Sequence, residues 1–448
     1  MNLISARWLI VPALALAVPH PVSAATLSRA ERQIVAAVDR GTPAALDLLE
    51  RAVNVNSGTM NLAGVREVGR LFEPEFKALG FSTEWVEGAA WGRAGHLIAR
   101  RRERGNGPRV LLIGHLDTVF EHDSPFQRFE RLSDSTARGP GVIDMKGGNA
   151  VMLLALRALR EAGALDRLAV TVILTGDEEK AGAPLALARR DLIAAAEWAD
   201  VAIGFEDGAG DPRTAVVARR GATSWVLRTA GRPAHSSQIF REGVGSGAIY
   251  EAARILTAFR DSLVQPYLTF NPGVILGGTA IAFDREASRG TAFGKTNVIA
   301  ESTAVAGDLR ALSIEQRDDA KATMSRIVAD HLPQTGAEIV FSDGYPPLAP
   351  SEGNQRLLAM YDQASRDLGF GAVAPVDPSR AGAADVSFTE GLVEMALDGV
   401  GLMGDGGHTV AETADLRTLP SQAKRMAVML ARLAEGWASH RRKASRGR

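Results

Sequence analysis

Three short apolar runs, each closely followed by a histidine or an acidic residue, constrain the fold of this chain more than any other feature. Residues 110–113, 169–174 and 201–205 are aliphatic or β-branched at nearly every position, which predicts strands buried on both faces. Stretches with helical spacing of apolar residues, at 148–161 and 184–196, lie between them. This alternation predicts an α/β domain whose mostly parallel sheet is covered by helices.

The same domain continues on both sides of these strands. Helical spacing predicts helices at residues 27–38, 43–53 and 65–79, followed by strands at 81–86 and 96–100. Towards the C-terminus we expect a helix at 354–368, a strand at 393–397 and a helix at 421–437. With 448 residues, 46% of them hydrophobic, the chain is long enough for a second core.

A second unit is predicted to interrupt this domain at residues 218–342. The sequence indicates strands at 223–228, 274–283, 296–300, 304–312 and 339–341. A helix is expected at 245–263, and another begins with Ser313 and Gln316 in capping-box spacing and ends near residue 332. The apolar face predicted for the first helix contains Ile249, Ala253, Leu256, Phe259 and Leu263. We therefore expect a compact, ferredoxin-like βαββαβ unit, with the Pro- and Gly-rich residues 343–353 leading back to the main domain.

The N-terminus has the pattern of an export signal. Arg7 is followed by apolar residues 8–18, and Val22-Ser23-Ala24 offers a small-residue cleavage site. We expect residues 1–24 to be removed and the mature protein, with its catalytic domain in two parts at 25–217 and 343–448, to be periplasmic or secreted. No later run reaches the roughly 18 apolar residues that a membrane span needs, so stable membrane insertion is not expected.

Composition limits the chemistry. A formal net charge of −1 argues against a nucleic-acid partner. The chain has no cysteine, so a metal ion would be held by His, Asp or Glu.

Such residues lie where the predicted strands end. His115 and Asp117 follow the first strand, and a carboxylate on the same loop can fix the orientation of a metal-binding imidazole. Asp177-Glu178-Glu179 follows the second strand and Glu206-Asp207 follows the third. Ligands of open α/β sheets bind just beyond the carboxyl ends of parallel strands, so we expect these side chains at one edge.

Two more candidates come from loops rich in glycine. Asp144 lies at the start of a predicted helix, and His408 lies in Gly404-Asp-Gly-Gly-His-Thr409. Each residue alone also suits an ordinary role, since Asp144 can cap a helix, the glutamates can begin one, and His408 can be a loop residue. Together, two histidines and three carboxylates suit zinc or a similar metal, and one carboxylate can bridge two ions.

Four segments resemble one family of enzymes. They are Gly-His-Leu-Asp-Thr-Val at 114–119, Gly-Pro-Gly-Val-Ile-Asp-Met-Lys-Gly-Gly at 139–148, Asp-Glu-Glu at 177–179 and Gly-Gly-His at 406–408. These motifs, in this order, are similar to those of the aminoacylase and glutamate carboxypeptidase family of two-zinc metallopeptidases. The similarity extends from about residue 40 to residue 430.

The resemblance implies a role for each residue. It implies that His115 and Glu206 hold one zinc, that Glu179 and His408 hold the other, and that Asp144 bridges both, with cobalt or manganese as possible substitutes. Glu178 would be the general base and Asp117 the partner that orients His115. From the residues alone, either Glu206 or Asp207 could be the ligand.

The resemblance also assigns roles in the second unit, as a lid and dimerisation domain. His235 in Gly231-Arg-Pro-Ala-His235 is similar to a histidine that polarises the scissile carbonyl, often across a homodimer. Asn297 and Arg310 resemble groups that hold the substrate's carboxylate, for which a guanidinium offers a two-pronged match. The alternatives are a histidine at the core edge and a surface asparagine and arginine.

Three functions therefore remain open. The first is an exported zinc carboxypeptidase that releases a C-terminal amino acid from a peptide or an N-acyl amino acid. The second is an N-acyl-amino-acid deacylase or dipeptidase of the same family. The third is an exported solute-binding protein, which has no need of Glu178 beside Glu179. Residues 378–386 depart from the glycine-rich form of many relatives and are expected to line the specificity pocket, so a preference for glutamate is not carried over.

Overall fold

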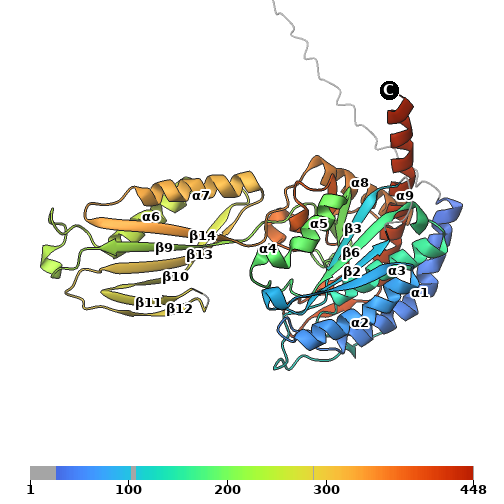
Figure 1. The fold of residues 1–448 in the computed structure, drawn as a ribbon, viewed down its shortest axis with the longest axis horizontal. Coiled ribbons are helices and arrows are strands. Elements are labelled where there is room, and N and C mark those ends of the chain that lie inside the picture. The colour runs from blue at the N-terminus through green and yellow to red at the C-terminus, as the bar shows by residue number, and fades with distance from the viewer. Residues whose placement is uncertain (1–26, 102–106, 286, 447–448) are drawn as a thin grey trace, which may run out of the picture.

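The computed structural model describes residues 27–101, 107–285 and 287–446 (Figure 1). The predicted export signal, residues 1–24, lies outside the described residues. Figure 1 shows two bodies, one around a sheet flanked by helices and one around a second sheet. Among the helices of these ranges, none combines the length and the apolarity that crossing a membrane requires.

A six-stranded sheet forms the centre of the larger body. Its strand order is β1 (Ser82–Glu87), β2 (Gly95–Arg101), β6 (Ala169–Thr175), β3 (Arg109–His115), β7 (Val201–Gly204) and β16 (Met395–Leu397). Strands β6, β3, β7 and β16 are parallel, whereas β2 pairs antiparallel with both β1 and β6. The α/β architecture is confirmed, with an antiparallel extension at one edge.

Helices cover both faces of this sheet, as the alternation of side chains along β3 shows. Val110 and Leu112 join the core formed with α1 (Arg29–Val53), α3 (Lys146–Glu161) and α9 (Thr418–Arg446). Leu111 and Ile113 point to the other face, in a core that includes Leu192 of α5 (Arg190–Trp198). The remaining helices of this body are α2 (Leu62–Ala78), α4 (Leu185–Ala188) and α8 (Glu352–Asp367).

The smaller body is a four-stranded antiparallel sheet with two helices. Its chain order is β9 (Thr223–Gly231), α6 (Ala248–Leu263), β10 (Thr269–Gly278), β13 (Ser302–Arg310), α7 (Ile314–Ala329) and β14 (Thr335–Asp343). The strands are ordered β10-β13-β9-β14, and the chain order is the expected βαββαβ. This unit has a hydrophobic core of its own, whose buried residues come from the stretch Trp225 to Val328. We call residues 223–343 the inserted unit.

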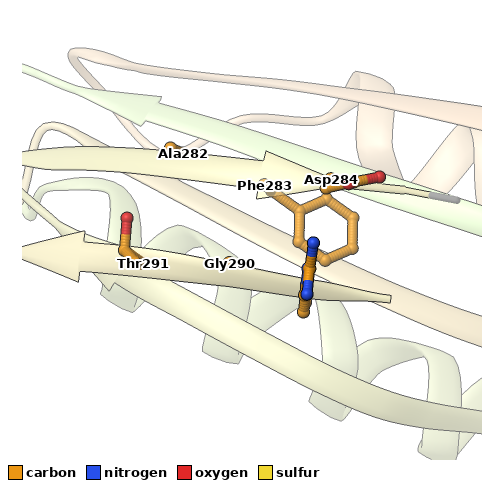
Figure 2. A pocket seen from close by; sticks show the side chains of 6 residues that line it. Ala282, Phe283, Asp284, Gly290 and Thr291 are labelled. Atoms are coloured by element: carbon orange, nitrogen blue, oxygen red, sulfur yellow. The ribbon is translucent and has the colours of Figure 1, made fainter. Parts of the chain in front are cut away.

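Short strands complete the fold. In the larger body β17 (Gly404–Asp405), β18 (Thr413–Asp415), β5 (Thr136–Arg138) and β4 (Glu130–Arg131) form a small sheet, and β15 (Ala374–Pro375) pairs with β8 (Thr214–Ala215). In the inserted unit, β11 (Ala280–Asp284) and β12 (Arg289–Phe293) form a hairpin. A shallow hollow on this hairpin is lined by Ala282, Phe283, Asp284, Arg289, Gly290 and Thr291 (Figure 2).

Several predicted element boundaries were wrong. The helices expected at 27–38 and 43–53 are one helix, α1, which continues through Pro43, while the Thr42 hydroxyl donates to the Val38 carbonyl 2.8 Å away. The helix expected at 184–196 is divided into α4 and α5 at Arg189, whose side chain turns into the interior. The strand expected at 274–283 is likewise divided, between β10 and β11.

Two predictions in the inserted unit also failed. Residues 296–300 form no strand beyond an isolated bridge between Val298 and His235. On α6, Phe259 and Leu263 are buried as predicted, but Ala252 and Ile255 are buried in place of the exposed Ile249 and Ala253. The same face carries the fully buried Glu251, which accepts a hydrogen bond from the backbone nitrogen of Leu332 and so fixes the rotation of the helix.

Candidate metal centre

Five side chains form two adjoining groups at the carboxyl edge of the sheet. The first group is His115, Asp144 and Glu206, and the second is Asp144, Glu179 and His408; within each group the potential ligand atoms all lie within 4.8 Å of one another. Asp144 belongs to both groups because its two oxygens face different histidines. Its Oδ1 is 3.0 Å from His115 Nε2, and its Oδ2 is 2.8 Å from His408 Nε2.

The fold explains why these residues meet. His115 is the last residue of β3, Glu206 follows the end of β7, and Glu179 lies on the loop that leaves β6. These three strands are parallel neighbours, so their carboxyl ends lie side by side. Asp144 precedes α3, and His408 lies on the loop between β17 and β18.

The remaining distances complete the two groups. His115 Nε2 is 3.6 Å from Glu206 Oε1, and His408 Nε2 is 3.1 Å from Glu179 Oε2. Asp207 belongs to neither group, and burial, followed by the charge of Asp144, raises its pKa to about 7. The geometry therefore favours Glu206 over Asp207 as a ligand.

Asp117 connects the first histidine to the loop of the two glutamates. His115 Nδ1 lies 3.0 Å from the backbone oxygen of Asp117 and 3.4 Å from its Oδ1. The buried carboxylate also accepts hydrogen bonds from the backbone nitrogens of Glu178 (3.0 Å) and Glu179 (3.1 Å) and from the hydroxyl of Thr59 (2.6 Å). Asp117 therefore fixes both the imidazole and the backbone of the neighbouring loop.

The electrostatics of the cluster suit a bound cation. Burial raises the pKa of Glu178 and Glu206 well above their usual range, because negative charge is concentrated away from water. Hydrogen bonds to Asp144 and Glu179 raise the pKa of His408 to about 11. Glu179 Oε1 is buried and has no hydrogen-bond partner among the described residues. A pair of divalent cations would neutralise this excess charge and satisfy that oxygen, so the oxygen and nitrogen donors fit zinc, cobalt or manganese.

Glu412 fixes the backbone of the loop that carries Asp144, and the sequence analysis did not identify it. Its buried carboxylate accepts hydrogen bonds from the backbone nitrogens of Gly141 (3.0 Å), Ile143 (2.9 Å) and Asp144 (3.2 Å). Its backbone oxygen accepts a further bond from Gly139 at 3.4 Å. One residue near His408 therefore holds the whole loop that carries the shared carboxylate.

Two buried arginines form a further layer that the sequence did not reveal. Arg189 Nη1 is 2.7 Å from Asp177 Oδ1, and its Nε is 2.7 Å from Asp385 Oδ1. Asp385 lies in the stretch expected to line a specificity pocket, yet it is buried in this ion pair. Arg219 Nε is 2.7 Å from Asp398 Oδ2, and the other oxygen of Asp398 accepts the backbone nitrogen of Glu206 at 3.2 Å.

The three candidates in the inserted unit lie apart from the cluster. The exposed His235 has its Nδ1 2.9 Å from Ser237 Oγ, and Arg310 Nε is 3.0 Å from Asp308 Oδ2. The exposed Asn297 accepts a hydrogen bond from the backbone nitrogen of Ser236 on its own backbone oxygen. Within the described part of the chain, no hydrogen bond or ion pair joins these three residues to the five-residue cluster. Their roles in substrate binding stay predictions.

Known proteins resemble the chain along most of its length. Carboxypeptidase G2 of Pseudomonas sp. (strain RS-16) is 28% identical over 403 residues, which cover 88% of this chain and 90% of that protein. A tripeptidase from Staphylococcus aureus has a similar structure, with a TM-score of 0.66 and 20% identity over 88% of this chain and 99% of that one. A dinuclear metal-binding peptidase from Bacillus subtilis superposes with a TM-score of 0.60 and 14% identity, covering 89% of this chain and 99% of the other.

A family model gives the assignment. The model of peptidase family M20/M25/M40 matches residues 111–434, well over half of the chain. This range begins inside β3, just before His115, and ends in α9, so it contains all five residues of the cluster. The chain therefore belongs to peptidase family M20/M25/M40 and is a hydrolase.

Proposed function

We propose that this protein is an exported two-zinc carboxypeptidase, which hydrolyses the amide bond to a C-terminal amino acid in a peptide or an N-acyl amino acid. The observation that carries this proposal is the shared Asp144, with one oxygen facing each of two ligand groups. His115 and Glu206 would hold one ion, and Glu179 and His408 the other. Similarity to a carboxypeptidase over 88% of the chain supports the choice of reaction.

The residues of the cluster suit amide hydrolysis. Two divalent cations, when bound, supply a Lewis acid for the substrate carbonyl and lower the pKa of the attacking water. Glu178 would take the proton of that water and return it to the leaving amine. Its neighbour Glu179 is paired with His408, so we assign the role of base to Glu178 and the role of metal ligand to Glu179.

The inserted unit is proposed to recognise the substrate. A guanidinium can hold a carboxylate through two parallel hydrogen bonds, so Arg310, with Asn297, would bind a free C-terminus. His235 would polarise the scissile carbonyl, in a homodimer in which each inserted unit serves the other subunit. A deacylase or dipeptidase remains the alternative, because the pocket that distinguishes these activities is not defined by the cluster. The solute-binding alternative gives way, since the chain is a hydrolase of this family.

A substrate panel tests the reaction. The chelator-treated protein is reloaded with zinc, cobalt or manganese and offered N-acyl amino acids and dipeptides, each also as its C-terminal amide. We expect hydrolysis of the free acids and little of the amides. Equal rates on acids and amides would contradict recognition of a C-terminal carboxylate, and no hydrolysis of any compound would overturn the carboxypeptidase assignment.

Export rests on the pattern of the first 24 residues and has its own test. N-terminal sequencing of protein from the native host should begin near Ala25. An intact Met1 would contradict processing and the periplasmic or secreted location proposed with it.

A further inference from the structure

Tyr345 lies on the segment that returns from the inserted unit, and its hydroxyl group reaches the loop of Glu178. This hydroxyl is 3.0 Å from the backbone oxygen of Glu178 and also contacts Arg189 Nη2. The side chain of Arg189 is completely buried, and its other nitrogens bind Asp177 and Asp385. Tyr345 therefore joins the buried ion pair to the backbone of the proposed general base.

The direction of these hydrogen bonds follows from the chemistry of the groups. An arginine side chain has donors and no acceptor, so Arg189 must donate to the oxygen of the Tyr345 hydroxyl. The single proton of the hydroxyl is then free for the carbonyl of Glu178. The ring is held in place as well, since it packs edge-on against Phe388 at 5.0 Å and lies 5.3 Å from the Arg189 guanidinium.

Both backbone polar groups of Glu178 are consequently held by side chains from other parts of the chain. Its nitrogen donates to Asp117 Oδ1 at 3.0 Å, and its oxygen accepts from Tyr345. The preceding residue is fixed too, because Arg189 Nη2 donates to the backbone oxygen of Asp177 at 3.0 Å. The direction of the Glu178 side chain is thus set by two anchors on opposite sides of its peptide groups.

Tyr345 is also part of the connection to the inserted unit. Its backbone oxygen accepts the nitrogen of Ala222 at 2.9 Å, and the nitrogen of Gly344 donates to the oxygen of Ala222 at 2.9 Å. The outgoing and returning segments are therefore hydrogen-bonded to each other at the residue that touches the loop of Glu178.

We propose that Tyr345 is a positioning residue, which orients Glu178 through its backbone oxygen and links that orientation to the connection with the inserted unit. The inference rests on the proposed role of Glu178 as general base. It assigns to one tyrosine hydroxyl an effect on turnover that neither the metal ligands nor the substrate-binding groups account for.

Tyr345→Phe tests this with little disturbance, because the ring and its packing remain. We expect kcat to fall about tenfold, with KM and the content of two metal ions unchanged, since small misplacements of a catalytic group cost this much or more. Tyr361→Phe is the matched control. Tyr361 is fully buried, whereas Tyr345 is half-buried, and the Tyr361 hydroxyl donates to Gln422 Oε1 at 3.1 Å in the core between α8 and α9. The control should lose stability and keep its kcat.

A second background separates positioning from general damage. If the hydroxyl acts through Glu178, then Tyr345→Phe should have no further effect on the residual activity of Glu178→Gln. A tenfold loss in both backgrounds, a normal kcat in Tyr345→Phe, or loss of metal from that variant would each overturn the inference.

Hydrogen exchange gives a readout that does not depend on activity. Tyr345→Phe should speed the exchange of backbone amides at residues 177–182, where Glu178 and Glu179 lie, whereas Tyr361→Phe should not. Unchanged exchange would refute the positioning role even if no substrate were hydrolysed. A wild-type protein that hydrolyses no compound of the substrate panel would refute the proposed function alone.

Discussion

Replacing Glu412 by glutamine should weaken both metal sites at once, although Glu412 belongs to neither. Its Oε1 accepts the backbone nitrogens of Ile143 and Asp144, and its Oε2 accepts that of Gly141. An amide can keep the first two bonds through its oxygen, but its NH₂ group then faces the N–H of Gly141. The variant loses one bond to a charged acceptor and leaves a buried donor without a partner.

The magnitude follows from these losses. A hydrogen bond to a charged group contributes about 1.5 to 3 kcal/mol, so we expect the loop of Asp144 to lose roughly 2 kcal/mol of its preference for this conformation. If that cost falls on metal binding, the affinity drops about 30-fold, within the 10- to 100-fold range usual for residues that support ligands. Because Asp144 faces both groups, the two ions should weaken together.

Competition with a chromogenic chelator measures the affinity of each ion. Glu251→Gln is the control, since Glu251 is as buried and accepts the backbone nitrogen of Leu332 at 3.0 Å, but lies in the inserted unit. Glu251→Gln should lower the free energy of unfolding and leave the affinity for both metal ions unchanged. Wild-type affinity in Glu412→Gln would refute the idea that the loop is held by this carboxylate, and weakening of one ion alone would refute the sharing of Asp144.

Three further predictions concern the cluster itself. Glu178→Gln should keep two metals and turn over about 10² to 10⁴ times more slowly. Glu179→Gln should first show weaker metal binding, with partial rescue by excess zinc. Metal analysis combined with kinetics checks both variants, and the opposite pattern would exchange the two roles. Metal binding at neutral pH should release protons and weaken as the pH falls. The pKa of His408 is raised to about 11 in the metal-free cluster, so the imidazole carries a proton that the ion must displace. Titration calorimetry in two buffers measures the release, and an affinity independent of pH would contradict it. Removing the metal with a chelator should abolish hydrolysis and leave the far-UV circular dichroism spectrum nearly intact, since both bodies have apolar cores of their own, and global unfolding would show a structural metal.

Local signals explain what could be predicted of the site. His115, Glu179 and Glu206 each follow an apolar run that ends at the same edge of the sheet, so their meeting follows from the alternation of strands and helices. The supporting residues have no such signal. Glu412 binds backbone groups 268 to 271 residues earlier in the chain, and Asp385 binds an arginine 196 residues away. Pairs of this kind form only in the complete fold, and they produce no periodic pattern in the sequence from which they could be predicted.

The same distinction holds for the fold. Apolar periodicity predicted most helices and strands, including the inserted βαββαβ unit. It could not give the strand order, because an apolar run carries no information on which strand it pairs with. Helix α1 shows a second limit. Apolar spacing predicted two helices, at 27–38 and 43–53, yet one helix continues through Pro43, since packing against α3 and α9 outweighs the local preference.

The place of the inserted unit in the chain has a consequence for synthesis. Residues 223–343 are continuous and enclose their own core, so this core can be complete once β14 has been synthesised. The larger body must wait, because β16 completes its sheet and α9 packs against α1 and α3 only when the last residues emerge. The middle of the chain can thus fold before its beginning, and the larger body is completed when the inserted unit already has its core.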